Sequence, residues 1–159
     1  MAQRAVIISG YFNPGPHAGH VAYAKEAREL AGEGGVVYCI VNSDHQAVLK
    51  KGYSFIPESD RLAAMGALKY VDKAFVSIDK DRTVCETIRM IYDSEETKPN
   101  VFYNSGDVTP DKPCPEAVVC KELGMEIMYG GTPKIQSSSW ILEDSVKVAY
   151  EKMYGGAAR

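Results

Sequence analysis

No apolar run in this chain approaches the roughly 20 residues that would cross a membrane, and the first residues lack the apolar region of a secretory signal. Charge of one sign is not in excess either, since 18 Lys and Arg residues balance 21 Asp and Glu residues. A basic surface for nucleic acid is therefore not expected. These absences predict a cytoplasmic protein that acts on a small molecule, with neither a membrane nor a nucleic acid as its partner.

Cysteine is scarce, and its four positions form no C-x-x-C pair of the kind that binds zinc or exchanges disulfides. We therefore expect reduced cysteines that pack in the interior. Hydrophobic residues, by contrast, make up 45% of the sequence, which is enough for one core without covalent staples. The expectation is a single domain over residues 1–159.

Short runs of β-forming residues alternate with segments whose apolar residues recur about every 3.6 positions. Because a parallel neighbour can be reached only through a long crossover, this alternation predicts a doubly wound, Rossmann-like α/β fold of about five parallel strands with helices on both faces. The expected strands are Ala5 to Ser9, Val36 to Val41, Lys73 to Ser77, Val101 to Tyr103 and Glu126 to Tyr129. The expected helices are Ala18 to Ala31, Ser59 to Tyr70, Thr83 to Tyr92, Pro115 to Leu123 and Ser139 to Met153.

Such sheets bind ligands beyond the carboxyl ends of their strands, so the loop after the first strand is the first place to look. This loop contains no G-x-G-x-x-G sequence, which argues against a dinucleotide-binding oxidoreductase. It does contain His17 and His20, three positions apart at a helix start, where N–H groups favour an anion. The pair could bind phosphate or only cap the helix. No metal is expected, because helical zinc pairs usually stand four apart.

The first loop also carries a family resemblance. Gly10-x-Phe12-Asn13 followed by His17-Ala18-Gly19-His20 resembles the G-x-F-[D/N] … H-x-G-H signature of the cytidylyltransferase-like nucleotidyltransferases. One departure is that this loop is a residue longer than the usual signature between Phe12 and His20. The resemblance implies that His17 and His20 are catalytic and that nucleotide contacts come from Gly10, Tyr11, Phe12, Asn13 and Gly19.

The end of the second strand reads V-N-S-D … K-G, from Val41 to Gly52. Its residues alone allow a solvated polar loop with mobile lysines. The string is similar, however, to the adenylyltransferase domain of ADP-heptose synthases and to their glycerol-phosphate cytidylyltransferase relatives. That similarity implies that Lys51 contacts phosphates in catalysis and that Asn42 and Asp44 bind the acceptor.

Two further positions extend the resemblance toward the acceptor. Arg61 falls in the first turn of an expected helix that Ser59 or Asp60 can cap, and its charge opposes the helix dipole, so it needs a carboxylate or a phosphate as partner. Asp107 matches the G-G-D-Y-x-P loop of the heptose enzymes, which reads S-G-D-V-T-P here. The resemblance implies that Arg61 and Asp107 bind the acceptor, although the second loop departs from the pattern at two positions.

Ser137, Ser138 and Ser139 stand ahead of the last helix and offer hydroxyl and N–H groups at its N-terminus. A plain N-cap would need only one of them. The family carries an I-S-T-T or Y-S-T-T segment at this place, which implies that the serines bind the triphosphate. The arginine that usually precedes this segment is missing, and Lys134 is a candidate for the compensating charge.

Together the motifs predict a nucleotidyltransferase that moves a nucleoside monophosphate from an NTP to a sugar or polyol phosphate such as heptose 1-phosphate. ATP is favoured over CTP, because two segments look most like the heptose branch. An acceptor phosphate is already ionised at pH 7, so no general base is needed and catalysis should rest on positioning and electrostatic stabilisation. Mg2+ is expected to arrive mainly on the triphosphate.

Other interpretations stay open. A sensor module could bind nucleotides on the same scaffold without turnover. The Asn13-Pro14 pair also resembles the nicotinamide-mononucleotide adenylyltransferases, which allows an acceptor of the mononucleotide type. Dimers are common in the family, so a homodimer is a further expectation.

Overall fold

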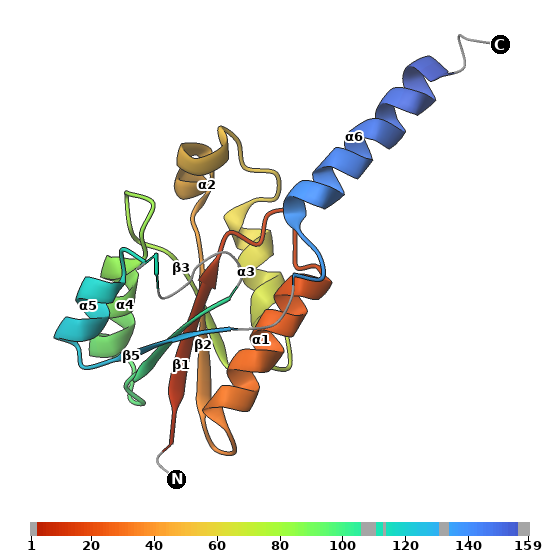
Figure 1. Cartoon of the computed structure of the whole chain (residues 1–159). Coiled ribbons are helices and arrows are strands. Elements are labelled where there is room, and N and C mark those ends of the chain that lie inside the picture. Colours follow the sequence, from red (N-terminus) through yellow and green to blue (C-terminus); the bar gives the residue numbers. More distant parts are fainter. Residues whose placement is uncertain (1–2, 106–110, 113, 131–133, 156–159) are drawn as a thin grey trace.

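In the computed structural model, which describes residues 3–105, 111–112, 114–130 and 134–155, five strands alternate with six helices (Figure 1). The strands are β1 (Ala5–Gly10), β2 (Val36–Val41), β3 (Lys73–Val76), β4 (Val101–Asn104) and β5 (Glu126–Tyr129). The helices are α1 (Ala18–Ala31), α2 (Asp44–Lys51), α3 (Glu58–Gly66), α4 (Cys85–Ser94), α5 (Ala117–Glu122) and α6 (Ser138–Tyr154). The five expected strands are confirmed, with ends that differ by one residue at most.

The strands form one parallel sheet in the order β3–β2–β1–β4–β5. The chain starts at the central strand β1, moves outward to β3, and then returns to the other side of β1 to add β4 and β5. The strand order therefore reverses between β1 and β4, which confirms the doubly wound fold. Ligands of such sheets bind at the carboxyl ends of the strands near this point, where the loop from β1 to α1 lies.

Two cores form because side chains alternate across the sheet. Along β1, Val6 and Ile8 belong to the core that α1 and α3 cover. Ala5 and Ile7 belong to the core that α4 and α5 cover. Figure 1 shows these two helix pairs on opposite sides of the sheet. The cysteines are free, and three of the four are buried in these cores, as expected.

Helix α2 corrects the interpretation of the segment after β2 as a polar loop with mobile lysines. Ser43 is its N-cap, with Ser43 Oγ accepting from Gln46 N at 3.2 Å and Gln46 Oε1 accepting from Ser43 N at 3.1 Å. This reciprocal S-x-x-Q pattern is a capping box, and Gly52, with a φ of 83°, ends the helix. The capping box and the terminal glycine can both be recognised in the sequence. Lys51 is therefore fixed on the last turn of a helix.

Helix α3 begins earlier than expected. Its N-cap is Pro57, whose fixed φ suits the start of a helix, and no side chain caps it. The expectation that Ser59 or Asp60 caps this helix is therefore wrong. Glu58 at its first position accepts instead from the backbone N–H of Asp44 at 2.7 Å, which ties α3 to the start of α2.

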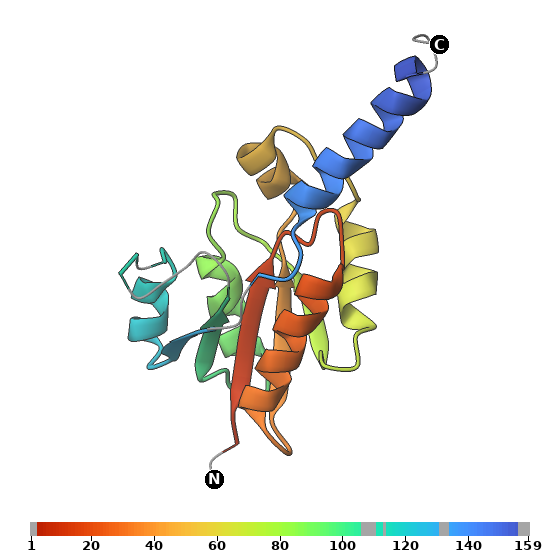
Figure 2. The ribbon, with the colours of Figure 1, turned by 45° about the vertical axis from the view of Figure 1, so that its right-hand side comes forward.

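Helix α6 stands apart from the two layers. Figures 1 and 2 show it projecting from the body at the same end of the molecule as α2, and none of its residues is buried. Among the helices in the described part of the chain, neither α6 nor any other is long and apolar enough to span a bilayer.

Candidate active site

Two imidazoles cap the start of α1. The Nδ1 atom of His17, the N-cap residue, accepts from Gly19 N at 3.0 Å, and His20 Nδ1 accepts from His17 N at 3.2 Å. The rings stack with their centroids 3.7 Å apart. Because both bonds use Nδ1, the proton of each neutral ring lies on Nε2. Capping and phosphate binding are thus compatible, because the two cap bonds use Nδ1 and do not involve the Nε2–H donor of either histidine.

Both histidines are held in the neutral form. Burial lowers the pKa of His20 to about 3, with further contributions from His17 and Lys51. Burial and the nearby charge of Lys134 lower the pKa of His17. Lys51 ends α2, which follows the carboxyl end of β2, and Lys134 packs on Trp140 at the start of α6, so both lysines lie at the same end of the sheet as the histidines. Neutral N–H donors beside ammonium groups are suited to an anion.

The buried side chain of Phe12 packs against the ring of His20. The two rings meet edge to face with centroids 4.9 Å apart. Gly10 provides the room, because a Cβ atom there would lie only 2.9 Å from Phe12 Cζ. In this structure Gly10 and Phe12 therefore position His20, and their expected contact with the nucleotide stays a prediction.

The starts of α1 and α6 adjoin at this site (Figure 2). A Cβ atom on Gly19 would lie 3.0 Å from the backbone oxygen of Gln136, so the approach of this segment requires a glycine in α1. Ser138 Oγ donates to Pro14 O at 2.9 Å. Ser137 Oγ accepts from Trp140 N at 3.1 Å and caps α6. Two helix N-termini, each favourable for negative charge, therefore lie side by side.

Aromatic rings and lysines pair around the same region. Lys50 Nζ lies 4.4 Å from the ring centroid of the half-buried Tyr11, and Lys134 Nζ lies 5.3 Å from that of Trp140. Ser139, next to Trp140 in the sequence, is exposed at the second position of α6. The expected nucleotide contacts of Tyr11 and Ser139 stay predictions.

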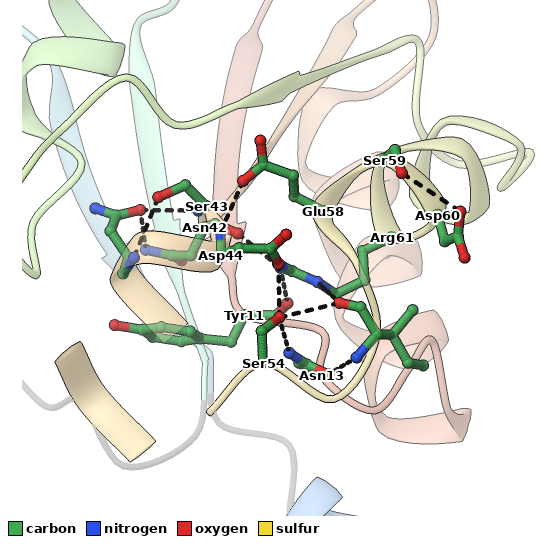
Figure 3. A network of polar contacts seen from close by, with 12 residues as sticks. Tyr11, Asn13, Asn42, Ser43, Asp44, Ser54, Glu58, Ser59, Asp60 and Arg61 are labelled. Atoms are coloured by element: carbon green, nitrogen blue, oxygen red, sulfur yellow. Dashed lines mark hydrogen bonds and ion pairs between the residues drawn. The ribbon is translucent and has the colours of Figure 1, made fainter. Parts of the chain in front are cut away.

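The fully buried side chain of Arg61 connects three loops near this region through hydrogen bonds (Figure 3). Its Nη1 donates to Tyr11 O at 2.7 Å and to Asn42 O at 2.6 Å. Its Nε donates to Ile56 O at 2.8 Å, and its Nη2 pairs with Asp44 Oδ1 at 2.8 Å. The partner that the sequence required is a carboxylate, and this burial argues against a direct contact of Arg61 with the acceptor.

Two asparagines are bound into the same network. Asn13 Nδ2 donates to Ser54 Oγ at 3.1 Å, and its Oδ1 accepts from Ile56 N at 2.8 Å. Asn42 Nδ2 donates to Gln46 Oε1 at 3.0 Å. Both asparagines are buried, so the structure gives them the role of holding loops together. Their expected ligand contacts stay predictions.

Asp44 keeps a side chain that is 41% exposed. Burial alone would raise the pKa of its carboxyl, but hydrogen bonds from Ser54 and Arg61 lower the pKa below its ordinary value. An ionised, partly exposed carboxylate can accept hydrogen bonds from acceptor hydroxyls, and the expected contact of Asp44 with the acceptor stays a prediction.

Asp107, the other expected acceptor-binding carboxylate, lies outside the described residues. Among those described, no group of three or more His, Cys, Asp and Glu side chains could hold a metal ion.

Sequence reasoning missed two polar residues of the site. Gln46 was signalled by the S-x-x-Q capping box. Ser54 carried no signal, because it joins Asn13, which is 41 positions away, to Asp44. Such a contact exists only in the folded chain.

The lowered pKa of His20 predicts a pH effect on stability. Because the unfolded ring titrates near its ordinary value of 6.5 and the native ring near 3, the free energy of unfolding should fall as the pH drops below about 6.5. This group alone should cost about 2 kcal/mol at pH 5 relative to pH 8. His20→Asn, whose amide oxygen can replace the Nδ1 acceptor, should remove that part of the slope. Urea unfolding of both proteins between pH 5 and 8 checks this, and equal slopes would contradict it.

The model of the cytidylyltransferase-like family matches residues 7–136, from β1 to the segment that precedes α6. A solved structure, the lipopolysaccharide core biosynthesis protein from Thermoplasma volcanium, covers 83% of this chain and 99% of its own at a TM-score of 0.62. Its sequence identity of 22% supports the similarity of fold alone.

Curated relatives agree with the family match. FAD synthase from Methanopyrus kandleri is 35% identical over 51% of this chain and 53% of its own length. FAD synthase from Methanoregula boonei is 35% identical over 62% and 70%. The bifunctional protein HldE from Pelobacter propionicus is 33% identical over 85% of this chain but only 24% of its own length. The chain thus spans about half the length of the first relative and a quarter of HldE. It belongs to the cytidylyltransferase-like family of nucleotidyltransferases.

Proposed function

We propose that this chain transfers a nucleoside monophosphate, AMP by preference, from an NTP to the phosphate of an acceptor and releases pyrophosphate. The observation that carries the proposal is the meeting of the α1 and α6 N-termini around the Nε2–H donors of His17 and His20. A triphosphate needs several donors and positive charges in one place. Lys51 and Lys134 supply charge to the same histidine pair.

The chemistry follows from this arrangement. An oxygen of the acceptor phosphate forms a bond to the α-phosphorus, the bond to the oxygen between the α and β phosphates breaks, and pyrophosphate leaves with the electron pair. Negative charge grows on the leaving group and on the α-phosphate oxygens. His17 and His20 donate Nε2–H bonds to these oxygens, and Lys51 stabilises the charge. No side chain has to remove a proton, because the acceptor is already ionised.

Mg2+ enters this scheme with the triphosphate. The described side chains offer donors to phosphate rather than a cage of carboxylates, which fits an ion bound mainly by phosphate oxygens and water. The ion would neutralise part of the triphosphate charge.

Arg61 has an indirect role in this scheme. It donates hydrogen bonds to the backbone carbonyl groups of Tyr11 and Asn42, and so holds the loops that carry the site.

Two acceptor classes deserve comparison. The resemblance of the V-N-S-D segment to the heptose branch supports a sugar phosphate such as heptose 1-phosphate. The FAD synthase relatives support FMN, because FAD consists of FMN joined to AMP. Both acceptors end in a phosphate monoester, and the FAD relatives add support for ATP as the donor.

Pyrophosphate release tests the proposal. The protein is incubated with Mg2+ and either ATP or CTP, together with FMN, heptose 1-phosphate or glycerol 3-phosphate. We expect release that depends on both substrates, fastest with ATP. Binding of the NTP without release from any pair would favour a nucleotide sensor and contradict the proposal.

A further inference from the structure

The acceptor phosphate of the proposed reaction needs a positive partner, and the burial of Arg61 leaves this need unmet. The acceptor is negatively charged at pH 7 and has to be held beside a triphosphate that is negative as well. Arg61, the arginine expected to bind it, is fully buried and donates to backbone carbonyl groups and to Asp44. An exposed cation near the strand ends is therefore required in its place.

Arg82 is an exposed arginine at this end of the sheet. It lies in the segment between β3 and α4, which begins at the carboxyl end of β3. Its Nη2 donates to Leu49 O at 2.8 Å, in the last turn of α2. Within the described part of the chain this is its one hydrogen-bond partner, although a guanidinium carries several N–H donors. The bond therefore holds the guanidinium against α2 and leaves donors for a ligand.

Lys50 connects Arg82 to the first loop. Its backbone follows Leu49, whose carbonyl group Arg82 binds, and its Nζ lies 4.4 Å from the ring centroid of Tyr11. Figure 3 shows that the Tyr11 ring points away from the Arg61 network, although Arg61 binds the backbone carbonyl group of Tyr11. Two cations and a phenol thus gather on the side of this loop that the Arg61 network does not occupy.

The hydroxyl of Tyr11 can act as a donor in this cluster. Burial raises its pKa, the charge of Arg82 lowers it, and the charge of Glu116 raises it, with a raised pKa as the result. The hydroxyl therefore keeps its proton at neutral pH. The carboxylate of Glu116 is buried and already accepts from Val84 N at 3.0 Å. The cluster thus offers an anion two positive charges and a neutral O–H group.

Two successive lysines at the end of α2 place this cluster next to the histidine pair. After burial, Lys51 is among the groups that lower the pKa of His20, whereas Lys50 lies over the ring of Tyr11. Successive side chains point about 100° apart around a helix, so the two ammonium groups serve neighbouring but different places. Transfer at the α-phosphorus needs such a pair of sites, because the attacking and leaving oxygens lie on opposite sides of the phosphorus.

We propose that Arg82, Lys50 and Tyr11 form the binding site for the acceptor phosphate. The ligand class is a phosphate monoester, whichever group the ester carries. Arg82 offers a planar fork of donors to the phosphate oxygens, Lys50 adds a point charge, and the Tyr11 hydroxyl donates a further hydrogen bond. The name of acceptor site rests on the proposed function, but binding of a phosphate monoester does not require turnover.

Steady-state kinetics tests the site with variants that separate the two substrates. Arg82→Ala should raise the KM for the acceptor about tenfold or more, because it removes charge-assisted hydrogen bonds, and should leave the KM for the NTP within about twofold. Tyr11→Phe should raise the KM for the acceptor by a smaller factor. Arg89→Ala, which removes a surface arginine bonded to Glu122, should change neither constant. An unchanged KM for the acceptor in Arg82→Ala, or a larger change for the NTP, would overturn the site.

Calorimetry without turnover separates this inference from the proposed function. FMN, heptose 1-phosphate and glycerol 3-phosphate are each titrated in the presence of Mg2+ and an ATP analogue whose α and β phosphates are bridged by a methylene group. At least one should bind, and Arg82→Ala should weaken it about tenfold or more, while the same compound without its phosphate should bind both proteins equally. Binding of none of the three, or equal binding to both proteins, would overturn the site. Binding that depends on Arg82, without pyrophosphate release from any substrate pair, would contradict the proposed function and leave the phosphate site standing.

Discussion

Replacing His20 with alanine should lower kcat for nucleotidyl transfer about a hundredfold or more, which is on the order of 3 kcal/mol of lost transition-state stabilisation. The Nε2–H of His20 is a donor fixed in place by the bond from His17 N to Nδ1 and by the Phe12 ring. Its charge does not change across the neutral range, because its pKa is about 3. The lost group is therefore a preorganised hydrogen-bond donor rather than a general base.

Two control variants separate this role from capping. His20→Asn can keep an acceptor for His17 N but lacks the Nε2–H donor, so it should lose turnover while staying folded. His45→Ala removes the exposed third histidine, whose Nε2 lies 3.1 Å from Lys80 O, and should leave kcat unchanged. Steady-state pyrophosphate release, with circular dichroism of each variant, makes the comparison. Full turnover of folded His20→Asn would show that His20 only caps the helix.

Replacing Arg61 with alanine should lower the free energy of unfolding by about 3–5 kcal/mol, because it removes a fully buried guanidinium that donates to three backbone carbonyl groups and a carboxylate. The substitution removes the Arg61 donors from the carbonyl groups of Tyr11, Asn42 and Ile56 and from the carboxylate of Asp44, and Ser54 then remains as a donor to Ile56 O and to Asp44. The loops of the site should loosen as a result, so the KM for the NTP should rise in whatever fraction remains folded. Urea unfolding and steady-state kinetics measure the two effects.

The matched control is another arginine that pairs with carboxylates. Arg89 bonds Glu122 and pairs with Glu86 at the surface, where water screens the charges. Arg89→Ala should therefore move the urea midpoint far less than Arg61→Ala. Arg61→Lys offers a point charge without the planar fork of donors, and it should recover only part of the stability. Equal midpoints for the two alanine variants would show that the Arg61 network does not hold the loops.

Much of the framework could be predicted from local sequence patterns. Strands such as Val36–Val41 are continuous apolar runs, as buried parallel strands require, and each is followed by a helical period. The position of His17 and His20 followed from the rule that strand ends carry function. Helix α2 could have been predicted as well, since its capping box and terminal glycine are local signals.

The roles of the site residues could not be predicted in the same way, because they depend on contacts between segments that are distant in the sequence. The site motifs contain Asn13, Asn42 and Arg61, but motif position does not reveal whether a side chain faces a ligand or the interior. Arg61 bonds Tyr11, which lies 50 positions away, and this bond can be known only after the loops meet. The exposure of helix α6 was equally hidden, because the apolar spacing of a helix in the sequence is the same whether the helix packs on its own body or projects from it.

The fate of the phosphorus atoms of ATP tests the central proposal most directly. With a competent acceptor phosphate, label at the α-phosphorus should appear in the acceptor product, and label at the γ-phosphorus should appear in pyrophosphate. This result would establish attack at the α-phosphorus, as the histidine and helix-terminus donors require. Transfer of the γ label to the acceptor, or release of labelled orthophosphate without any α transfer, would contradict the proposed function.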